Sequence, residues 1–104
     1  MNTTEIRTMD EIGRIVVPHN YRTALSWGAN TALQANFCNK TNGVTLVQAQ
    51  NTAPQAATVT VDNFGRVSLP KSMRTKLGLT SIAGQDTLEI SINMMDRAVS
   101  LKRA

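Results

Sequence analysis

Several stretches of this chain alternate apolar and polar residues, which is the pattern of a β-strand with one buried face. In residues 88–94, Leu, Ile, Ile and Met take every second position, and Glu, Ser and Asn lie between them. Residues 58–61 alternate in the same way, and residues 66–69 follow after the sequence DNFG. Asp and Asn can bond to nearby backbone and Gly tolerates positive φ, so DNFG favours a turn. The pattern predicts two strands joined by a turn, with a further strand near the C-terminus.

A short helix is expected between these strands. Pro70 suits the first position of a helix, where its missing N–H costs nothing. Met73 and Leu77 are four residues apart and would form an apolar stripe, and Gly78 is a typical C-terminal stop. The strand at 88–94 is followed by a turn and by a returning strand with apolar residues at alternate positions. The predicted order is therefore strand, turn, strand, short helix, hairpin.

The first half of the chain follows the same order. Residues 9–18 read MDEIGRIVVP and residues 61–70 read VDNFGRVSLP, so Asp, Gly, Arg and Pro recur at a spacing of 52. RTAL at 22–25 matches RTKL at 74–77. After three additional residues in the second copy, the apolar positions of the closing hairpins match at a spacing of 55. A self-match of this length indicates two copies of one supersecondary unit.

The first copy carries weaker local signals than the second. Pro18 is expected to begin its helix, with Tyr21 facing the core. Ser26 stands where the second copy has its stop glycine. Asn42 and Gly43 mark the closing hairpin, because Asn-Gly is a strong signal for a tight two-residue turn.

The length of the chain limits how the two copies can fold. A chain of 104 residues has room for one compact domain, and each copy alone is near the size at which a core seldom suffices. We therefore expect a single domain, 1–104, in which repeat 5–47 and repeat 58–103 share one core. The uncharged segment 48–57 has one proline and no large apolar group, so we expect it to be a surface linker.

Composition indicates a globular, cytoplasmic protein. Hydrophobic residues make up 41% and charged residues 17% of the chain. No apolar run approaches the ~20 residues needed to cross a bilayer, and the N-terminus lacks the pattern of a signal peptide. Cys38 is the single cysteine, so no disulfide can form within the chain, which fits a reducing compartment.

The net charge of +4 is unevenly distributed. Residues 1–52 hold four basic and three acidic residues, whereas residues 53–104 hold seven and four. A basic balance favours a polyanionic partner without demanding one. The charge alone leaves nucleic-acid binding and a plain basic surface about equally favoured.

The repeated pattern resembles a known family. Each copy carries Asp-x-x-Gly-Arg, then apolar residues and Pro, then a short helix with an arginine and a Leu-Gly or equivalent end. This closely resembles the AbrB/SpoVT/MazE family, over almost the whole chain and twice in register. The resemblance implies a mainly β fold with two short helices: a swapped-hairpin β-barrel, usually built by two chains and here built with pseudo-twofold symmetry by one. Members act mostly as bacterial transcriptional regulators and antitoxins.

The resemblance also implies which residues face DNA. Five arginines carry over by position, and Lys71 joins them because it precedes the second helix's arginine by three residues on the same polar side. The set is Arg7, Arg14, Arg22, Arg66, Lys71 and Arg74. Val59 stands where a second copy of Arg7 would be. The helix arginines lie about 100° from their core-facing neighbours, so we expect them to be exposed. From the residues alone, an alternative remains: solvated arginines, two of them paired with Asp10 and Asp62.

Other chemistry has weak support. Asp10 and Asp62 could be read as a catalytic carboxylate pair, but a turn-capping role fits their position better. His19 is the single histidine, so no histidine-based metal cluster or catalytic triad can form within the chain. We expect His19 to be exposed and Cys38 to have no part in function. Aromatic residues make up 4%, which is too few for base-stacking recognition of single strands. We expect neither an enzyme nor a cofactor.

The favoured function is a transcriptional regulator, a repressor, that binds double-stranded DNA by phosphate contacts and by sequence or shape readout. An antitoxin-like or other protein-binding module of the same fold is the alternative. We expect a cytoplasmic, nucleoid-associated protein with no membrane contact and no small-molecule substrate. Monomeric pseudo-dimer and homodimer both remain open as its oligomeric state.

Overall fold

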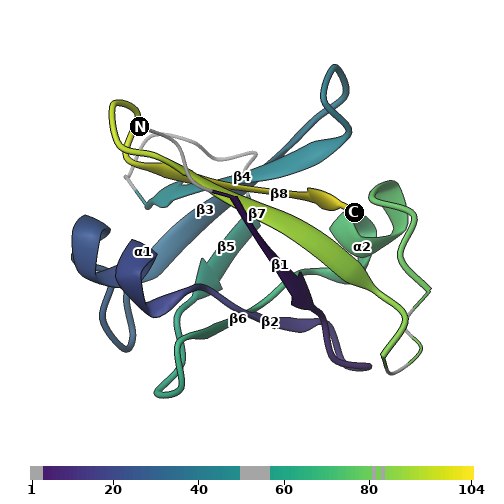
Figure 1. Cartoon of the computed structure of the whole chain (residues 1–104), viewed down its shortest axis with the longest axis horizontal. Helices are drawn as coiled ribbons and strands as arrows, with labels where there is room; N and C mark the ends of the chain where they lie inside the picture. The colour runs from purple at the N-terminus through teal and green to yellow at the C-terminus, as the bar shows by residue number, and fades with distance from the viewer. Residues whose placement is uncertain (1–3, 50–56, 81, 83) are drawn as a thin grey trace.

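The computed structural model describes all residues except 1–3, 50–56, 81 and 83. In the described residues, eight strands and two helices follow one another in two rounds of the predicted order (Figure 1). The first round contains β1 (Thr4–Thr8), β2 (Arg14–Val16), α1 (His19–Leu25), β3 (Ala32–Cys38) and β4 (Gly43–Gln48). The second contains β5 (Ala57–Thr60), β6 (Arg66–Ser68), α2 (Lys71–Lys76), β7 (Thr87–Asn93) and β8 (Ala98–Arg103).

The strands of the two repeats interleave. An antiparallel six-stranded sheet has the order β1-β7-β8-β4-β3-β5, and a second sheet consists of β2 and β6 alone. β1 of the first repeat pairs with β7 of the second, and β5 of the second pairs with β3 of the first. Figure 1 shows the β2–β6 ribbon below the large sheet, with α1 and α2 at opposite sides of the view. Neither repeat has a sheet of its own, which is why the two share one body.

The pairing register relates the two repeats symmetrically. In the ribbon, Ile15 pairs with Val67, its own counterpart at a spacing of 52. In the large sheet, Thr45 of β4 pairs with Ser100 of β8, its counterpart at a spacing of 55. A residue can pair with its own equivalent only where two copies are related by a twofold axis. The chain therefore folds with an approximate twofold relation between its halves.

One core lies between the ribbon and the large sheet. Its fully buried side chains come from both repeats, including Ile15 and Leu33 of the first and Val67 and Leu88 of the second. Tyr21 is 1% exposed, and its hydroxyl donates a hydrogen bond to the carbonyl oxygen of Ile90 in β7, at 3.1 Å. The expectation that Tyr21 faces the core is confirmed, and its buried polar group joins α1 to the other repeat. A radius of gyration of 12.5 Å is close to the ~13 Å expected of a compact domain of this length.

The helix boundaries differ slightly from the prediction. Pro18 and Pro70 precede the helices instead of occupying their first position. Both have extended backbone, with ψ of 140° and 149°, so they lie just outside the first turn. The carbonyl oxygen of Pro18 accepts the N–H groups of Tyr21 and Arg22 and thereby starts the helix. At the other end, Ser26 adopts positive φ (59°), and Gly78 does so at the equivalent place (77°). The stop predicted at Gly78 is confirmed, and Ser26 takes the equivalent left-handed position in the first repeat.

The predicted linker is shorter in the structure. Gln48 ends β4 and Ala57 begins β5, because both belong to strands that pair with β3. Residues 50–56 lie outside the described residues. Within the described part of the chain, neither helix is long and apolar enough to cross a membrane.

Candidate nucleic-acid interface

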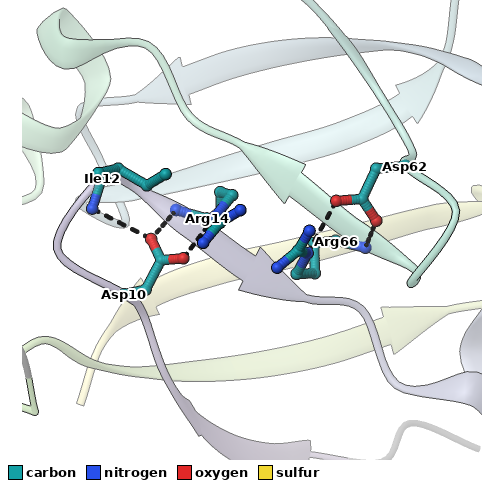
Figure 2. Close-up of polar contacts among 5 residues, drawn as sticks. All are labelled: Asp10, Ile12, Arg14, Asp62 and Arg66. Atoms are coloured by element: carbon teal, nitrogen blue, oxygen red, sulfur yellow. Dashed lines mark hydrogen bonds and ion pairs between the residues drawn. The ribbon is translucent and has the colours of Figure 1, made fainter.

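The ribbon formed by β2 and β6 presents two arginines on its outer face. Ile15 and Val67 point into the core, so their neighbours along each strand point outward. Arg14 lies opposite Ser68 and Val16 opposite Arg66. Figure 2 shows the two guanidinium groups on neighbouring strands, with Asp10 and Asp62 at the two outer ends. The structure thus brings together the two loop arginines that the sequence singled out.

Each of these arginines is held by the aspartate of its own turn. Asp10 accepts hydrogen bonds from the backbone N–H groups of Ile12 (3.1 Å) and Arg14 (2.7 Å), and its second oxygen lies 2.5 Å from Nε of Arg14. Asp62 repeats the arrangement with Phe64 (2.8 Å), the Arg66 N–H (2.9 Å) and Arg66 Nε (2.8 Å). The turn-capping interpretation of both aspartates is confirmed. The ion pairs considered for these arginines are also present.

The two aspartates stay ionised to a lower pH than an ordinary aspartate does. Partial burial alone raises the pKa of Asp10, but the backbone N–H and guanidinium of Arg14 and the N–H of Ile12 hold that pKa below its ordinary value. For Asp62, burial acts in the same direction, and the corresponding donors of Arg66 and Phe64 again lower its pKa overall. Stable carboxylates keep the guanidinium groups oriented along the ribbon.

The expectation that the helix arginines are exposed was wrong, because both are half-buried against the opposite repeat. Nε of Arg22 donates to the carbonyl oxygen of Val17 (2.9 Å), and Nε of Arg74 donates to that of Leu69 (3.2 Å). The Arg22 side chain crosses Gly65 of the second repeat's turn. These arginines therefore lie beside the ribbon and support its turns.

The two remaining predicted residues differ in position. Lys71 is exposed at the first residue of α2, two residues after Leu69, and so lies close in sequence to the end of β6. Arg7 lies on the edge strand β1 instead of the ribbon and forms an ion pair with Glu5. Val59, the counterpart of Arg7, is 6% exposed and serves the core.

Sequence reasoning missed the apolar residues around the ribbon. Phe64 is 74% exposed and Ile12 is 58% exposed, and each occupies the third position of its Asp-x-x-Gly turn. The guanidinium carbon of Arg66 lies 5.0 Å from the centre of the Phe64 ring. The signal was present in the repeat: both copies place a large apolar residue in a turn, where polar residues are usual. We name Ile12 and Phe64 the apolar tips.

Two other basic residues have structural roles. Nη2 of Arg97 donates to the carbonyl oxygen of Leu25 (2.8 Å), at the C-terminal end of α1. Nη1 of Arg103 donates to that of Gly78 (3.0 Å), beyond the end of α2. A cation at this end of a helix is favourable because the last carbonyl groups lack helical partners. These contacts account for two of the positive charges in the second half.

Metal binding, Cys38 and His19 are the other chemistry that the sequence raised. No group of three His, Cys, Asp or Glu side chains that could hold a metal occurs among the described residues. A hollow of about 470 Å³ on the outer side of the large sheet is bordered by Cys38, Thr45, Ser91 and Ser100. Hydrogen bonds from the backbone and hydroxyl of Thr41 lower the pKa of the Cys38 thiol. His19 is exposed, and its Nε2 lies 3.4 Å from the hydroxyl oxygen of Thr23.

Comparison with known proteins yields a fold but no family. No family model matches the chain, and no curated protein matches it. The chain is similar to the solution structure of PHS018 from Pyrococcus horikoshii, with a TM-score of 0.52 and 17% sequence identity. The match covers 97% of this chain and 87% of that one. At this identity the similarity concerns the fold alone.

Proposed function

We propose that this protein is a double-stranded DNA-binding transcriptional regulator, a repressor, of the AbrB/SpoVT/MazE type. The observation that carries the proposal is the ribbon, on which Arg14 and Arg66 share one outer face and are each held by an aspartate. Two-stranded β-ribbons bind B-DNA in its major or its minor groove. Guanidinium groups match both guanine edges and phosphate oxygens.

The fold supports this proposal. Exchange of β1 and β5 between the repeats is what a swapped-hairpin barrel made from one chain requires. In that arrangement the β2–β6 ribbon forms one face and the large sheet the other. The shared core and the approximate twofold relation place both Asp-x-x-Gly-Arg turns on one face, so a single chain presents two related contact sites.

The position of each residue would decide which part of the DNA it contacts. Arg14 and Arg66 would reach base edges or phosphates from the ribbon. Lys71 would contact phosphate from the start of α2, while Arg22 and Arg74 would position the turns and add positive potential beside them. Arg7 would extend the contact along β1. Because base contacts are few, DNA shape and deformability would carry part of the specificity.

A duplex titration across salt concentrations tests the proposal. Log affinity is expected to fall linearly with log salt, with a slope of about −0.9 per neutralised phosphate. The variant Arg14→Ala/Arg66→Ala should bind at least tenfold more weakly. The variant Lys40→Ala/Lys76→Ala removes the same charge away from the ribbon and serves as the control. Absence of binding to any duplex at low salt, or equal losses in the two variants, would refute the proposal.

A protein-binding module of the same fold is the second candidate. The observation that favours it is the exposed pair of apolar tips, Ile12 and Phe64. This candidate predicts a defined protein complex that forms in the absence of DNA and is lost in Phe64→Ala. As both halves of the fold come from one chain, we propose a monomer, which light scattering would distinguish from a homodimer.

A further inference from the structure

Hydrogen bonds close the turn that carries Phe64, and the side chain itself lies outside the core. The carboxylate of Asp62 accepts a hydrogen bond from the backbone N–H of Phe64. The N–H of Gly65 donates to the carbonyl oxygen of Asp62 (3.1 Å), and the N–H of Asp62 donates to the carbonyl oxygen of Arg66 (2.9 Å). Arg22 of the other repeat lies across Gly65. The Phe64 side chain takes no part in the core, and 74% of its surface is exposed to water.

The same feature occurs in both repeats, which makes chance exposure a poor explanation. Ile12 lies at the equivalent turn position, its N–H is accepted by Asp10, and it is 58% exposed. Large exposed apolar groups contribute nothing to folding, yet burying one in a complex is worth about 1.5–3 kcal/mol. The apolar tips are therefore available for contact with a partner.

The position of the tips relative to the ribbon suggests the partner. Arg14 pairs with Ser68 and Val16 with Arg66, so the two turns lie beyond opposite ends of the ribbon. At about 3.4 Å per strand residue, the three-residue ribbon and its turns place the tips roughly 15–20 Å apart. This distance corresponds to roughly five base pairs, because B-DNA rises about 3.4 Å per base pair.

The charge next to Phe64 favours DNA over an apolar protein surface. The Arg66 guanidinium lies over the ring at 5.0 Å from its centre, and Arg22 crosses the adjacent glycine. The carboxylate of Asp62 is engaged by the Arg66 ion pair and two N–H groups. Proteins that bind the minor groove insert apolar side chains such as Phe between base steps and kink the duplex, while their Arg and Lys side chains contact the same groove.

We infer that Phe64 is an apolar wedge that enters a base step of bound double-stranded DNA and kinks it, with Ile12 making the weaker, equivalent contact at the other end of the ribbon. The inference rests on the proposed function and adds to it a deformation of the duplex. It also predicts one preferred orientation of the protein on the duplex, because the two tips differ in size and only the phenyl ring is stacked with an arginine. Flexible pyrimidine–purine steps would be preferred beneath Phe64.

The test uses a short mixed-sequence duplex that contains TA and CA steps. One version carries 2-aminopurine at those steps to report unstacking, and another carries fluorescent labels at its two ends to report the end-to-end distance by energy transfer. The wild-type protein should raise the 2-aminopurine fluorescence, as the base unstacks, and shorten the end-to-end distance. Phe64→Ala should abolish both signals and weaken binding by about tenfold or more. Since Phe64 is neutral, its removal should leave the salt slope unchanged.

Two further variants keep the test specific. Phe64→Leu retains an apolar group but removes the ring beneath Arg66, so it should keep most of the kink. If Phe64→Leu behaves like Phe64→Ala, the ring serves only to orient Arg66, and the wedge is refuted. Met95→Ala removes another exposed apolar residue (96% exposed), on the β7–β8 hairpin in the upper part of Figure 1, and should change nothing.

The outcome also separates this inference from the proposed function. If the wild type binds no duplex at low salt, the proposed function fails and the wedge with it. If binding is linear in log salt and depends on Arg14 and Arg66 but not on Phe64, the wedge alone is refuted. Loss of a protein complex in Phe64→Ala, with DNA binding and bending intact, would likewise assign the tips to a protein partner and overturn the wedge.

Discussion

Arg22 of the first repeat lies directly across Gly65 of the second. A Cβ added to Gly65 would lie 2.6 Å from Nε of Arg22, closer than real Cβ contacts, and Gly65 has a φ of +78°. The reciprocal contact has the same form: a Cβ on Gly13 would lie 2.7 Å from Nε of Arg74. Each helix therefore positions the turn of the other repeat, and each ribbon arginine depends on both halves of the chain.

Replacing the glycine at this contact is expected to destabilise the protein. Gly65→Ala would add a Cβ both to a left-handed backbone and against Arg22, at a cost of about 2 kcal/mol in the free energy of unfolding. Chemical denaturation would show this as a lower midpoint with an unchanged slope. Gly28→Ala is the matched control, because a Cβ at Gly28 would have no atom within 4 Å apart from those of its two chain neighbours, and its effect should stay within about 0.5 kcal/mol.

A double-mutant cycle isolates the contact between the two residues. In an Arg22→Ala background, Gly65→Ala should cost less than in the wild type, because only the strain of positive φ remains. Equal costs in both backgrounds would show that Arg22 does not restrict the turn.

The turn aspartates predict a loss of stability in acid. The pKa values of both carboxyl groups in the folded protein lie below the ordinary value for Asp. Their contribution to the free energy of unfolding is therefore fully present above about pH 4, the ordinary range of Asp, and is lost as the pH falls through the folded pKa. Unfolding measured between pH 6 and pH 2 should show a falling free energy in this window. In Asp10→Asn/Asp62→Asn the dependence should be shallower, and an identical pH profile would contradict the assignment.

The helix ends allow an exchange between the repeats. Ser26 and Gly78 occupy equivalent left-handed positions, and a left-handed conformation costs a non-glycine residue about 1–2 kcal/mol. Ser26→Gly should therefore stabilise the protein by about 0.5–1 kcal/mol, after the greater chain entropy of glycine is subtracted. Gly78→Ser should destabilise it by a similar amount. Thermal unfolding measures both, and opposite signs are the expected result.

Position should decide which lysine affects DNA binding. Lys71 is exposed at the start of α2, close to β6, whereas Lys76 lies 5.5 Å from the centre of the Phe37 ring on β3. Lys71→Ala should reduce the salt slope of duplex binding by about 0.9, the value for one phosphate contact. Lys76→Ala removes the same charge and should leave the slope unchanged. A reduced slope in both variants would mean that general charge, not position, governs binding.

Local chemistry explains which parts of the ribbon were predictable. The Asp-x-x-Gly-Arg turns were predicted because an aspartate in a turn can accept hydrogen bonds from backbone N–H groups a few residues further on, and the structure shows those bonds at Asp10 and Asp62. The stop at Gly78 was predicted because glycine tolerates a left-handed backbone, which concerns one residue alone. The half-buried state of Arg22 could not be predicted, because the surface that covers it belongs to a turn 43 positions away in the sequence.

The amino-acid sequence by itself determined that the chain contains two copies of one unit, the order of strands and helices within each copy, and the turn that orients each ribbon arginine. These features depend on interactions over a few residues. Only the tertiary structure decided that β1 and β5 exchange partners, that Ile15 pairs with its own counterpart Val67, and that Phe64 stays outside the core. The physical reason is that a strand edge or an apolar side chain has no preferred partner until the remainder of the chain is packed around it.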